Sequence, residues 1–263
     1  MATLDLASLA APVGIVRVLQ VIFTCISFSL VASVGHYGGS FWTWCMFCWC
    51  FCFCVTFLIL LLEFLSVSAK LPISWSDLTA AVAMLATLMV SNLSPSSFYA
   101  VEVGLIRAKS GEISGFLSTV PGLLKVLEAF VACIIFICLD YIPFHVYAGL
   151  QWCVAVYSIC FIFAILVIIF TICRVLSLFP APFDKVLTVC NVLAVLMYIT
   201  AMVIWPLYSF RNNPRPSYCS SSFFTLCPWD TLVVVSVMTG INLVAYIVDT
   251  VYSFRLVFFI SRS

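Results

Sequence analysis

Charged residues are scarce in this sequence. Of its 263 residues, 11 are Lys or Arg and 10 are Asp or Glu, so charged residues make up 8% of the chain, against about 25% in soluble domains. Hydrophobic residues make up 65%. A folded surface in water needs more polar side chains than this chain contains. The shortage excludes a soluble globular domain, and lipid is the expected solvent for most of the chain.

Other shortages narrow the possible functions. A net charge of +1 provides no basic surface for nucleic acid. The two histidines, His36 and His145, fall in predicted short loops, and the motifs of zinc proteases, serine hydrolases, P-loop proteins and dinucleotide-binding folds are missing. The first ten residues lack the basic stretch of a signal peptide, so the first membrane helix is expected to start insertion. We predict a non-enzymatic protein that needs no cofactor or metal and binds no nucleic acid.

Six stretches are long enough to cross a bilayer, which takes about 20 mostly apolar residues. They are residues 15–34, 41–65, 123–142, 150–172, 186–208 and 231–254. Residues 76–91 are apolar but shorter, and a turn-like cluster at 92–97 separates them from a second short apolar stretch at 98–106. The predicted fold class is therefore all-α, a polytopic bundle of transmembrane helices.

Several tryptophans lie near the ends of these stretches, where amphipathic rings favour the membrane interface. They are Trp42, Trp44, Trp75, Trp205 and Trp229. We expect these rings to lie at the interface.

The chain contains an internal repeat at an offset of 108 residues. Arg17 and the three residues after it align with Lys125 and its successors, and Pro72 aligns with Pro180. The dipeptide Trp44-Cys45 aligns with Trp152-Cys153 at the same offset. Because the matched basic, Trp-Cys and loop proline residues are uncommon in apolar helices, one constant offset indicates a duplication.

The first copy is shorter than the second. Its match to the second copy fails after the third helix and resumes at an offset of 147, where residues 98–102 resemble residues 245–249. This short match aligns Glu102 with Asp249. The two offsets, 108 and 147, differ by 39 residues. The alternative is that the five-residue match is coincidental and the first copy has three helices.

The basic residues indicate the topology, because cytoplasmic loops carry an excess of Lys and Arg. With an inner amino terminus and four spans in the second copy, nine basic residues lie at cytoplasmic ends and only Arg211 and Arg215 lie outside. This requires residues 71–106 to enter and leave on one side as a re-entrant or collapsed hairpin. A single crossing there would invert the second copy, so crossing numbers of six, seven and eight stay open.

The cysteines divide into an embedded group and a loop pair. The embedded group includes Cys45, Cys48, Cys50, Cys52 and Cys54, which point in several directions around a helix and are expected to pack as small apolar side chains. Cys219 and Cys227 flank a polar stretch in the predicted outer loop, residues 209–229, and are a candidate disulfide, with two free thiols as the alternative. Cys173 at a predicted cytoplasmic helix end is a candidate palmitoylation site.

Charged residues within membrane segments are candidate functional sites, because they are costly there. The candidates are Arg17, Glu102, Lys125, Glu128 and Asp249. Arg17 and Lys125 start their helices and are expected to snorkel to water, and Lys125 shares a helix face with Glu128. The carboxylates are expected either to pair with these bases or tyrosines between helices or to form a proton or ion relay.

Several strings resemble the myeloid-associated differentiation marker family, which has two tandem MARVEL domains. They are FSLVASVG at 28–35, GEISG at 111–115, TVPGLLKVLE at 119–128, LQWCVAVY at 150–157 and INLVAY at 241–246. The resemblance implies eight spans, cytoplasmic termini and a cysteine pair in the loop before the last span, the position of Cys219 and Cys227. Residues 1–110 would then be a truncated MARVEL-like unit of two spans plus the hairpin, and residues 111–263 a unit of four spans.

The resemblance also implies a function. MARVEL proteins are associated with cholesterol-rich membrane apposition, trafficking and junctions, and this family with rafts, cortical actin and cell spreading. The expected protein is a plasma-membrane organiser whose partners are cholesterol-rich lipids and other membrane proteins, with an indirect link to cortical actin. The alternative is a small-solute or ion transporter or channel that uses the intramembrane carboxylates.

N-glycosylation sites engineered one at a time into residues 209–229 test the predicted topology. We expect the full-length protein to become glycosylated in cells, because the loop is predicted to lie outside. The measurement is a mobility shift that a glycosidase reverses. An unmodified loop, with modification of sites added to residues 174–182 instead, would contradict the hairpin at 71–106.

Overall fold

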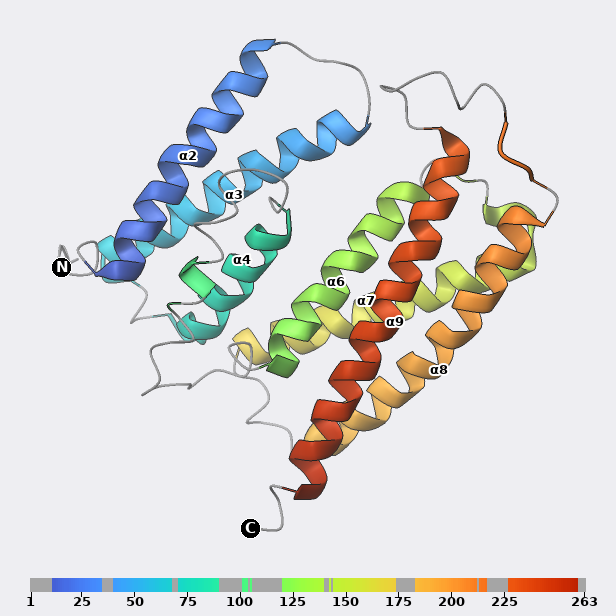
Figure 1. The fold of residues 1–263 in the computed structure, drawn as a ribbon. Coiled ribbons are helices and arrows are strands. Elements are labelled where there is room, and N and C mark those ends of the chain that lie inside the picture. Colours follow the sequence, from blue (N-terminus) through green and yellow to red (C-terminus); the bar gives the residue numbers. More distant parts are fainter. Residues whose placement is uncertain are drawn as a thin grey trace. The chain divides into compact units, whose positions relative to one another are not determined.

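The computed structural model describes residues 11–34, 40–67, 71–89, 101–103, 105, 120–139, 142, 144–173, 183–211, 213–216 and 227–259. The chain divides into two compact units (Figure 1). The first comprises Met1–Thr119 with Thr171–Arg174, and the second comprises Val120–Phe170 with Val175–Ser263.

All described regular structure is helical, and six helices are long and apolar enough to cross a membrane. They are α2 (Pro12–Val34), α3 (Ser40–Phe64), α6 (Val120–Leu139), α7 (Ala148–Ile172), α8 (Phe183–Phe210) and α9 (Pro228–Phe259). Each overlaps one of the six expected stretches. A helix satisfies its backbone hydrogen bonds internally, which hydrocarbon requires. The prediction of an all-α polytopic bundle is confirmed.

In the first unit, α2 packs against α3, and α4 (Trp75–Met89) also contacts α3 (Figure 1). The 15 residues of α4 extend about 22 Å at 1.5 Å per residue, less than the roughly 30 Å of a hydrocarbon core. Residues 101–103 and 105 are helical. The expected turn at 92–97 lies outside the described residues, so the re-entrant hairpin stays a prediction.

In the second unit, α9 packs against both α6 and α8 (Figure 1). Hydrogen bonds show that neighbouring helices run in opposite directions. Trp152 near the start of α7 donates to the Thr200 hydroxyl in the second half of α8 at 3.0 Å, and Trp205 near the end of α8 donates to the Leu232 carbonyl near the start of α9 at 3.3 Å. The unit is therefore an up-and-down bundle of four helices.

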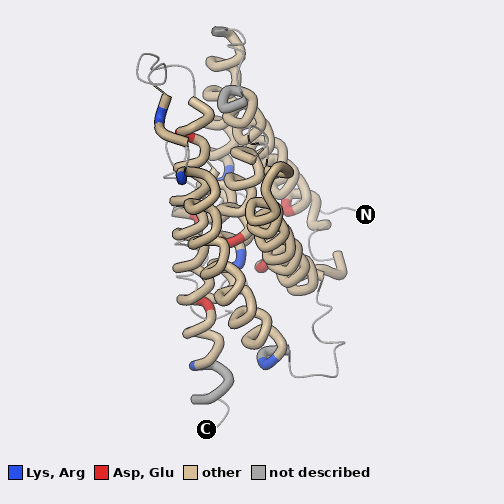
Figure 2. The backbone as a smooth tube through the Cα atoms, turned by 90° about the vertical axis from the view of Figure 1, so that its right-hand side faces the viewer, with Lys and Arg blue, Asp and Glu red and all other residues tan. Residues whose placement is uncertain are grey.

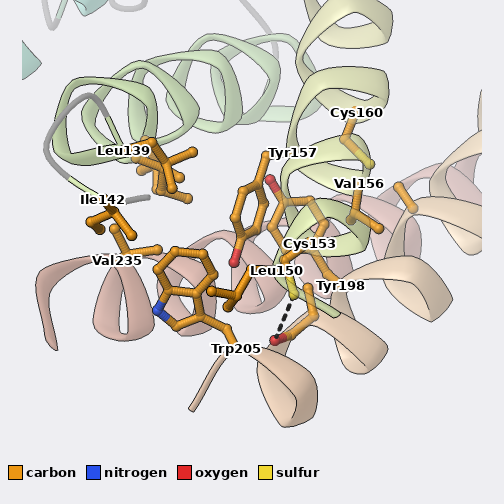
Figure 3. Close-up of a cluster of buried hydrophobic side chains, with 14 of the residues drawn as sticks. Leu139, Ile142, Leu150, Cys153, Val156, Tyr157, Cys160, Tyr198, Trp205 and Val235 are labelled. Carbon is orange, nitrogen blue, oxygen red and sulfur yellow. Dashed lines mark hydrogen bonds between the residues drawn. The ribbon is translucent and has the colours of Figure 1, made fainter. Parts of the chain in front are cut away.

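The interior of the second unit is built around three aromatic rings (Figure 3). Tyr157 of α7 lies between Tyr198 and Trp205 of α8, with ring centroids 5.9 and 6.3 Å away. All three side chains are fully buried. The Trp205 indole fills this core and its N–H donates to a carbonyl inside the unit, while its expected depth at the membrane interface stays a prediction.

The outer faces of the helices carry large apolar side chains. Exposed examples on α9 are Val237, Val244 and Val251, which recur every seven residues and so lie along one face. Charged residues occupy few positions along the helices, as the tan stretches of Figure 2 show. This distribution suits lipid outside and packed side chains inside.

Replacing Trp205 with alanine tests the aromatic core. We expect Trp205→Ala to lower the free energy of unfolding by at least about 3 kcal/mol, because the surrounding rings cannot fill the cavity. Thermal unfolding of the full-length protein in detergent measures the loss. Leu207→Ala on the exposed face of the same helix is the matched control, and equal losses in the two variants would contradict this account of the core.

Candidate functional site

Each unit contains a cluster of buried charged side chains. In the first unit, Nε of Arg17 on α2 lies 2.5 Å from Oε1 of Glu102, and both residues are buried. Nη1 of the same arginine lies 2.5 Å from Oε1 of Glu63 at the end of α3. Gln20, one turn further along α2, donates from Nε2 to the other oxygen of Glu102 at 2.8 Å. The arginine thus joins three segments that are distant in sequence.

The short helix α4 is attached to the same cluster. Trp75, its first residue, donates its indole N–H to Oε1 of Glu63 at 2.8 Å. Asp77 in its first turn accepts the hydroxyl hydrogen of Ser74 at 2.5 Å. An acidic residue and a hydroxyl at this position suit the unpaired N–H groups and the positive end of a helix. The start of α4 is therefore fixed by polar contacts.

In the second unit, Lys125 of α6 is the centre of the cluster. Its Nζ lies 2.7 Å from Oε2 of Glu128, 2.8 Å from Oδ2 of Asp249 on α9, and 2.7 Å from Oδ1 of Asn191 on α8. The side chains of Lys125, Glu128 and Asp249 are 0% exposed. An ammonium group has three N–H donors, so each has one acceptor here.

Further polar groups surround this lysine. Asn191 donates from Nδ2 to Oδ2 of Asp249 at 2.7 Å. The lysine ammonium also lies 4.8 Å from the centroid of the Tyr246 ring, a distance that allows a cation–π interaction. The hydroxyl of Tyr246 donates to the carbonyl of Cys160 at 3.2 Å, which brings in α7. All four helices of the unit contribute to one polar centre.

The cluster of the second unit lies within the membrane-spanning part of its helices rather than at their ends. At 1.5 Å per residue, Lys125 is about 8 Å along α6 from Val120 and Asp249 is about 9 Å along α9 from Arg255. A hydrocarbon core is about 30 Å thick. The expectation that Arg17 and Lys125 snorkel to water is wrong, because both are buried and their charges are met by carboxylates within the unit.

The two clusters occupy matching positions of the repeat. Arg17 aligns with Lys125 and Glu102 with Asp249, and each pair of positions forms an ion pair in its own unit. The second carboxylate differs, since Glu63 supplies it in the first unit and Glu128 in the second. Gln20 occupies the position that aligns with Glu128. Each cluster thus combines one cation with two carboxylates.

Sequence reasoning missed several members of these clusters. Glu63, Asn191, Asn242, Tyr198 and Tyr246 were not among its candidates. Asn191 and Asn242 are polar amides within long apolar helices, which is itself a signal of a buried partner. Glu63 lies at the end of its helix, where the sequence alone suggests that a carboxylate is exposed to water.

The cysteine predictions have different outcomes. In α3, Cys48 and Cys52 are buried while Cys50 and Cys54 are exposed. Among the described residues, no three His, Cys, Asp or Glu side chains could hold a metal ion. Cys227 is disulfide-bonded, but Cys219 lies outside the described residues, so their pairing stays a prediction. Cys173 is an exposed free thiol just after α7, and its acylation also stays a prediction.

Comparison with known proteins identifies both halves of the chain. The model of the MARVEL family, a membrane-associating domain, matches residues 8–107 and again residues 116–252. No solved structure is a significant match to the chain.

Several proteins similar to this chain along nearly its whole length carry one family name. A myeloid-associated differentiation marker homolog of Xenopus laevis is 42% identical, with 96% of this chain and 95% of the relative covered. The human myeloid-associated differentiation marker is 42% identical, with 95% and 90% covered, and the rat myeloid-associated differentiation marker-like protein 2 is 40% identical, with 98% and 95% covered.

These alignments also show that this chain is shorter than the matched region of a relative. The Xenopus match extends over 291 aligned positions, more than the 263 residues of this chain. The relative therefore has residues within the matched region that lack a counterpart here. The alignment length does not place these residues in either unit, so the truncated first unit stays a prediction.

A double-mutant cycle tests the ion pair of the first unit. We expect Arg17→Met to lower the free energy of unfolding by about 3–5 kcal/mol, because it leaves Glu102 buried without its cation. Arg17→Met/Glu102→Met is expected to recover part of the loss, since no buried charge is then unmatched at that position. Unfolding in detergent provides all four stabilities of the cycle.

The matched control is Arg215→Met. Arg215 pairs with Asp230 at 3.2 Å, and the two side chains are 50% and 38% exposed, so the substitution should cost less than about 1 kcal/mol. An equal cost at Arg17 and Arg215, or strictly additive losses at Arg17 and Glu102, would contradict a coupled buried pair.

Proposed function

The chain belongs to the myeloid-associated differentiation marker family and is a multi-pass membrane protein with two MARVEL matches, and we propose that it is a non-enzymatic organiser of membrane microdomains. It would act by lateral packing of its helices with lipids and with other membrane proteins. Cholesterol-rich lipid is the proposed environment, and the plasma membrane the proposed location.

The main support for this proposal is that the outer faces of the helices expose large apolar side chains whereas the charged side chains of the clusters are buried inside. Large apolar side chains are exposed on α2, α3, α7, α8 and α9, including Leu30 on α2, Phe57 on α3, Ile162 on α7 and Val203 on α8. On α6 the apolar side chains are buried or half-buried. Surfaces of this kind contact lipid tails or other transmembrane helices through dispersion and shape.

The polar interior supports a structural role. Lys125 has all three N–H donors directed at Glu128, Asp249 and Asn191, and Arg17 is held between two carboxylates. Groups committed to one another in this way are poor candidates for attacking or transferring atoms of a substrate.

The predicted connections between the helices are short, which favours an indirect link to cortical actin through other membrane proteins.

The alternative of a transporter or channel has one observation in its favour, the fully buried charges themselves. Two others weigh against it. Transport sites near the midplane are usually formed by interrupted helices, whereas α9 is continuous from Pro228 to Phe259 through Asp249. Asp249 also accepts from both Lys125 and Asn191. The organiser hypothesis therefore ranks first.

Cytoplasmic termini are part of the proposal and are supported by the distribution of Lys and Arg. With this orientation, Lys185 and Arg255, which lie at the same end of the antiparallel helices α8 and α9, face the cytoplasm. Arg211 and Arg215, in the segment between those helices, face the other side. Cys173 would then be accessible to cytoplasmic acylation.

Plasma-membrane vesicles that separate into ordered and disordered phases test the organiser hypothesis. We expect the fluorescently tagged full-length protein to concentrate in the ordered phase and to lose this preference when cholesterol is extracted. A Cys173→Ser variant separates the contribution of an acyl chain from that of the helices. Uniform exclusion from the ordered phase, before and after extraction, would contradict the proposal.

A further inference from the structure

The buried cluster of the second unit has one more carboxylate than it has cations. Lys125, Glu128 and Asp249 have fully buried side chains, so with both carboxyls ionised the group would carry a net negative charge away from water. An uncompensated charge in such surroundings is strongly unfavourable, and a carboxyl group there takes a proton instead. The imbalance calls for one additional positive charge.

The hydrogen bonds show the same deficit independently. Oε1 of Glu128 and Oδ1 of Asp249 have no hydrogen-bond partner within the described part of the chain. Oδ1 of Asn242 is likewise buried without a partner there, and the Nδ2 of this residue donates to the backbone carbonyl of Glu128 at 3.3 Å and to Tyr198 at 2.7 Å. Three buried acceptors in one region therefore lack a donor.

The three donor groups closest to the carboxylates by the observed hydrogen bonds are already committed. Lys125 directs its N–H groups to Glu128, Asp249 and Asn191. The amide of Asn191 donates to Asp249. The hydroxyl of Tyr246 donates to the Cys160 carbonyl. An added proton would supply the donor that these contacts leave missing.

We propose that this cluster is a binding site for one proton and that Glu128 holds it. Oδ2 of Asp249 lies within 2.8 Å of two donors, Lys125 and Asn191, whereas Oε2 of Glu128 has one donor at such a distance among the described residues, Lys125. The aspartate is therefore the better stabilised anion. The proton comes from bulk water when the unit assembles, and with it the cluster contains one ammonium, one carboxylate and one neutral carboxyl.

The titratable groups that face Glu128 come from every helix of the unit. Lys125 lies on its own helix α6, Cys160 on α7, Tyr198 on α8, and Tyr246 and Asp249 on α9. Lys125 is the sole cation among these five, and it is already matched by Asp249. The count of one surplus carboxylate therefore holds when all four helices are considered.

Infrared difference spectroscopy of the full-length protein in lipid bilayers tests the proposal. A protonated carboxyl has a carbonyl stretch that an ionised carboxylate lacks. We expect this band at neutral pH in the wild-type protein and its loss in Glu128→Gln. We also expect its loss in Asp249→Asn, where Glu128 becomes the sole carboxylate partner of Lys125 in the cluster and ionises.

Asp230→Asn, in the exposed pair with Arg215, is the matched control and should leave the band unchanged. A band that keeps its intensity in either the Glu128 or the Asp249 variant overturns the proposal. Isotopic labelling gives a second measurement that needs no variant. The band should shift when glutamate carboxyl carbons are labelled with ¹³C, and a shift on aspartate labelling instead overturns the assignment to Glu128.

Discussion

A charge placed in hydrocarbon has to be matched, and this constraint organises both units. Arg17 and Lys125 lie inside apolar helices where water cannot solvate them, and each pairs with two carboxylates, at least one of them from a helix that is distant in sequence. The second unit is fixed at one end by Lys125, Asn191 and Asp249 and further along by Trp205 and its aromatic neighbours. Because lipid provides no hydrophobic force between helices, such polar and packing contacts determine which helices meet and in which register.

The same constraint connects the fold with the proposed role. Buried charges engaged with one another leave the outer faces of the helices almost uniformly apolar, and those faces are the surfaces available to lipids and to other membrane proteins. The duplication has kept the pairing of a first-helix cation with a late carboxylate in both copies, while the second acid changed from Glu63 to Glu128. The pairing therefore survives a change in the residues around it, as expected for an element of architecture.

Sequence reasoning predicted the six spans because length and hydropathy are sufficient for helices in lipid. It also aligned Glu102 with Asp249 and Arg17 with Lys125, and it weighed pairing between these residues against an ion relay. It missed Glu63, Asn191 and Asn242, because contacts between helices depend on rotation about each helix axis, which uniformly apolar sequences such as α3 and α7 leave open. It did not predict the burial of Trp205 for a related reason. Position near a segment end suggests the interface, but burial is decided by the neighbouring helices.

The architecture of the second unit depends on the pairing of Lys125, inside the membrane, with the acidic side chains of Glu128 and Asp249. Solid-state NMR of the full-length protein in bilayers, with ¹⁵N in the lysine side chains and ¹³C in the carboxyl groups of Asp and Glu, measures this directly. We predict strong dipolar coupling between Lys125 Nζ and the carboxyl carbons of both Asp249 and Glu128, consistent with N···O separations of 2.8 and 2.7 Å. A lysine ammonium without coupling to Asp249, or one that exchanges freely with water, would contradict it.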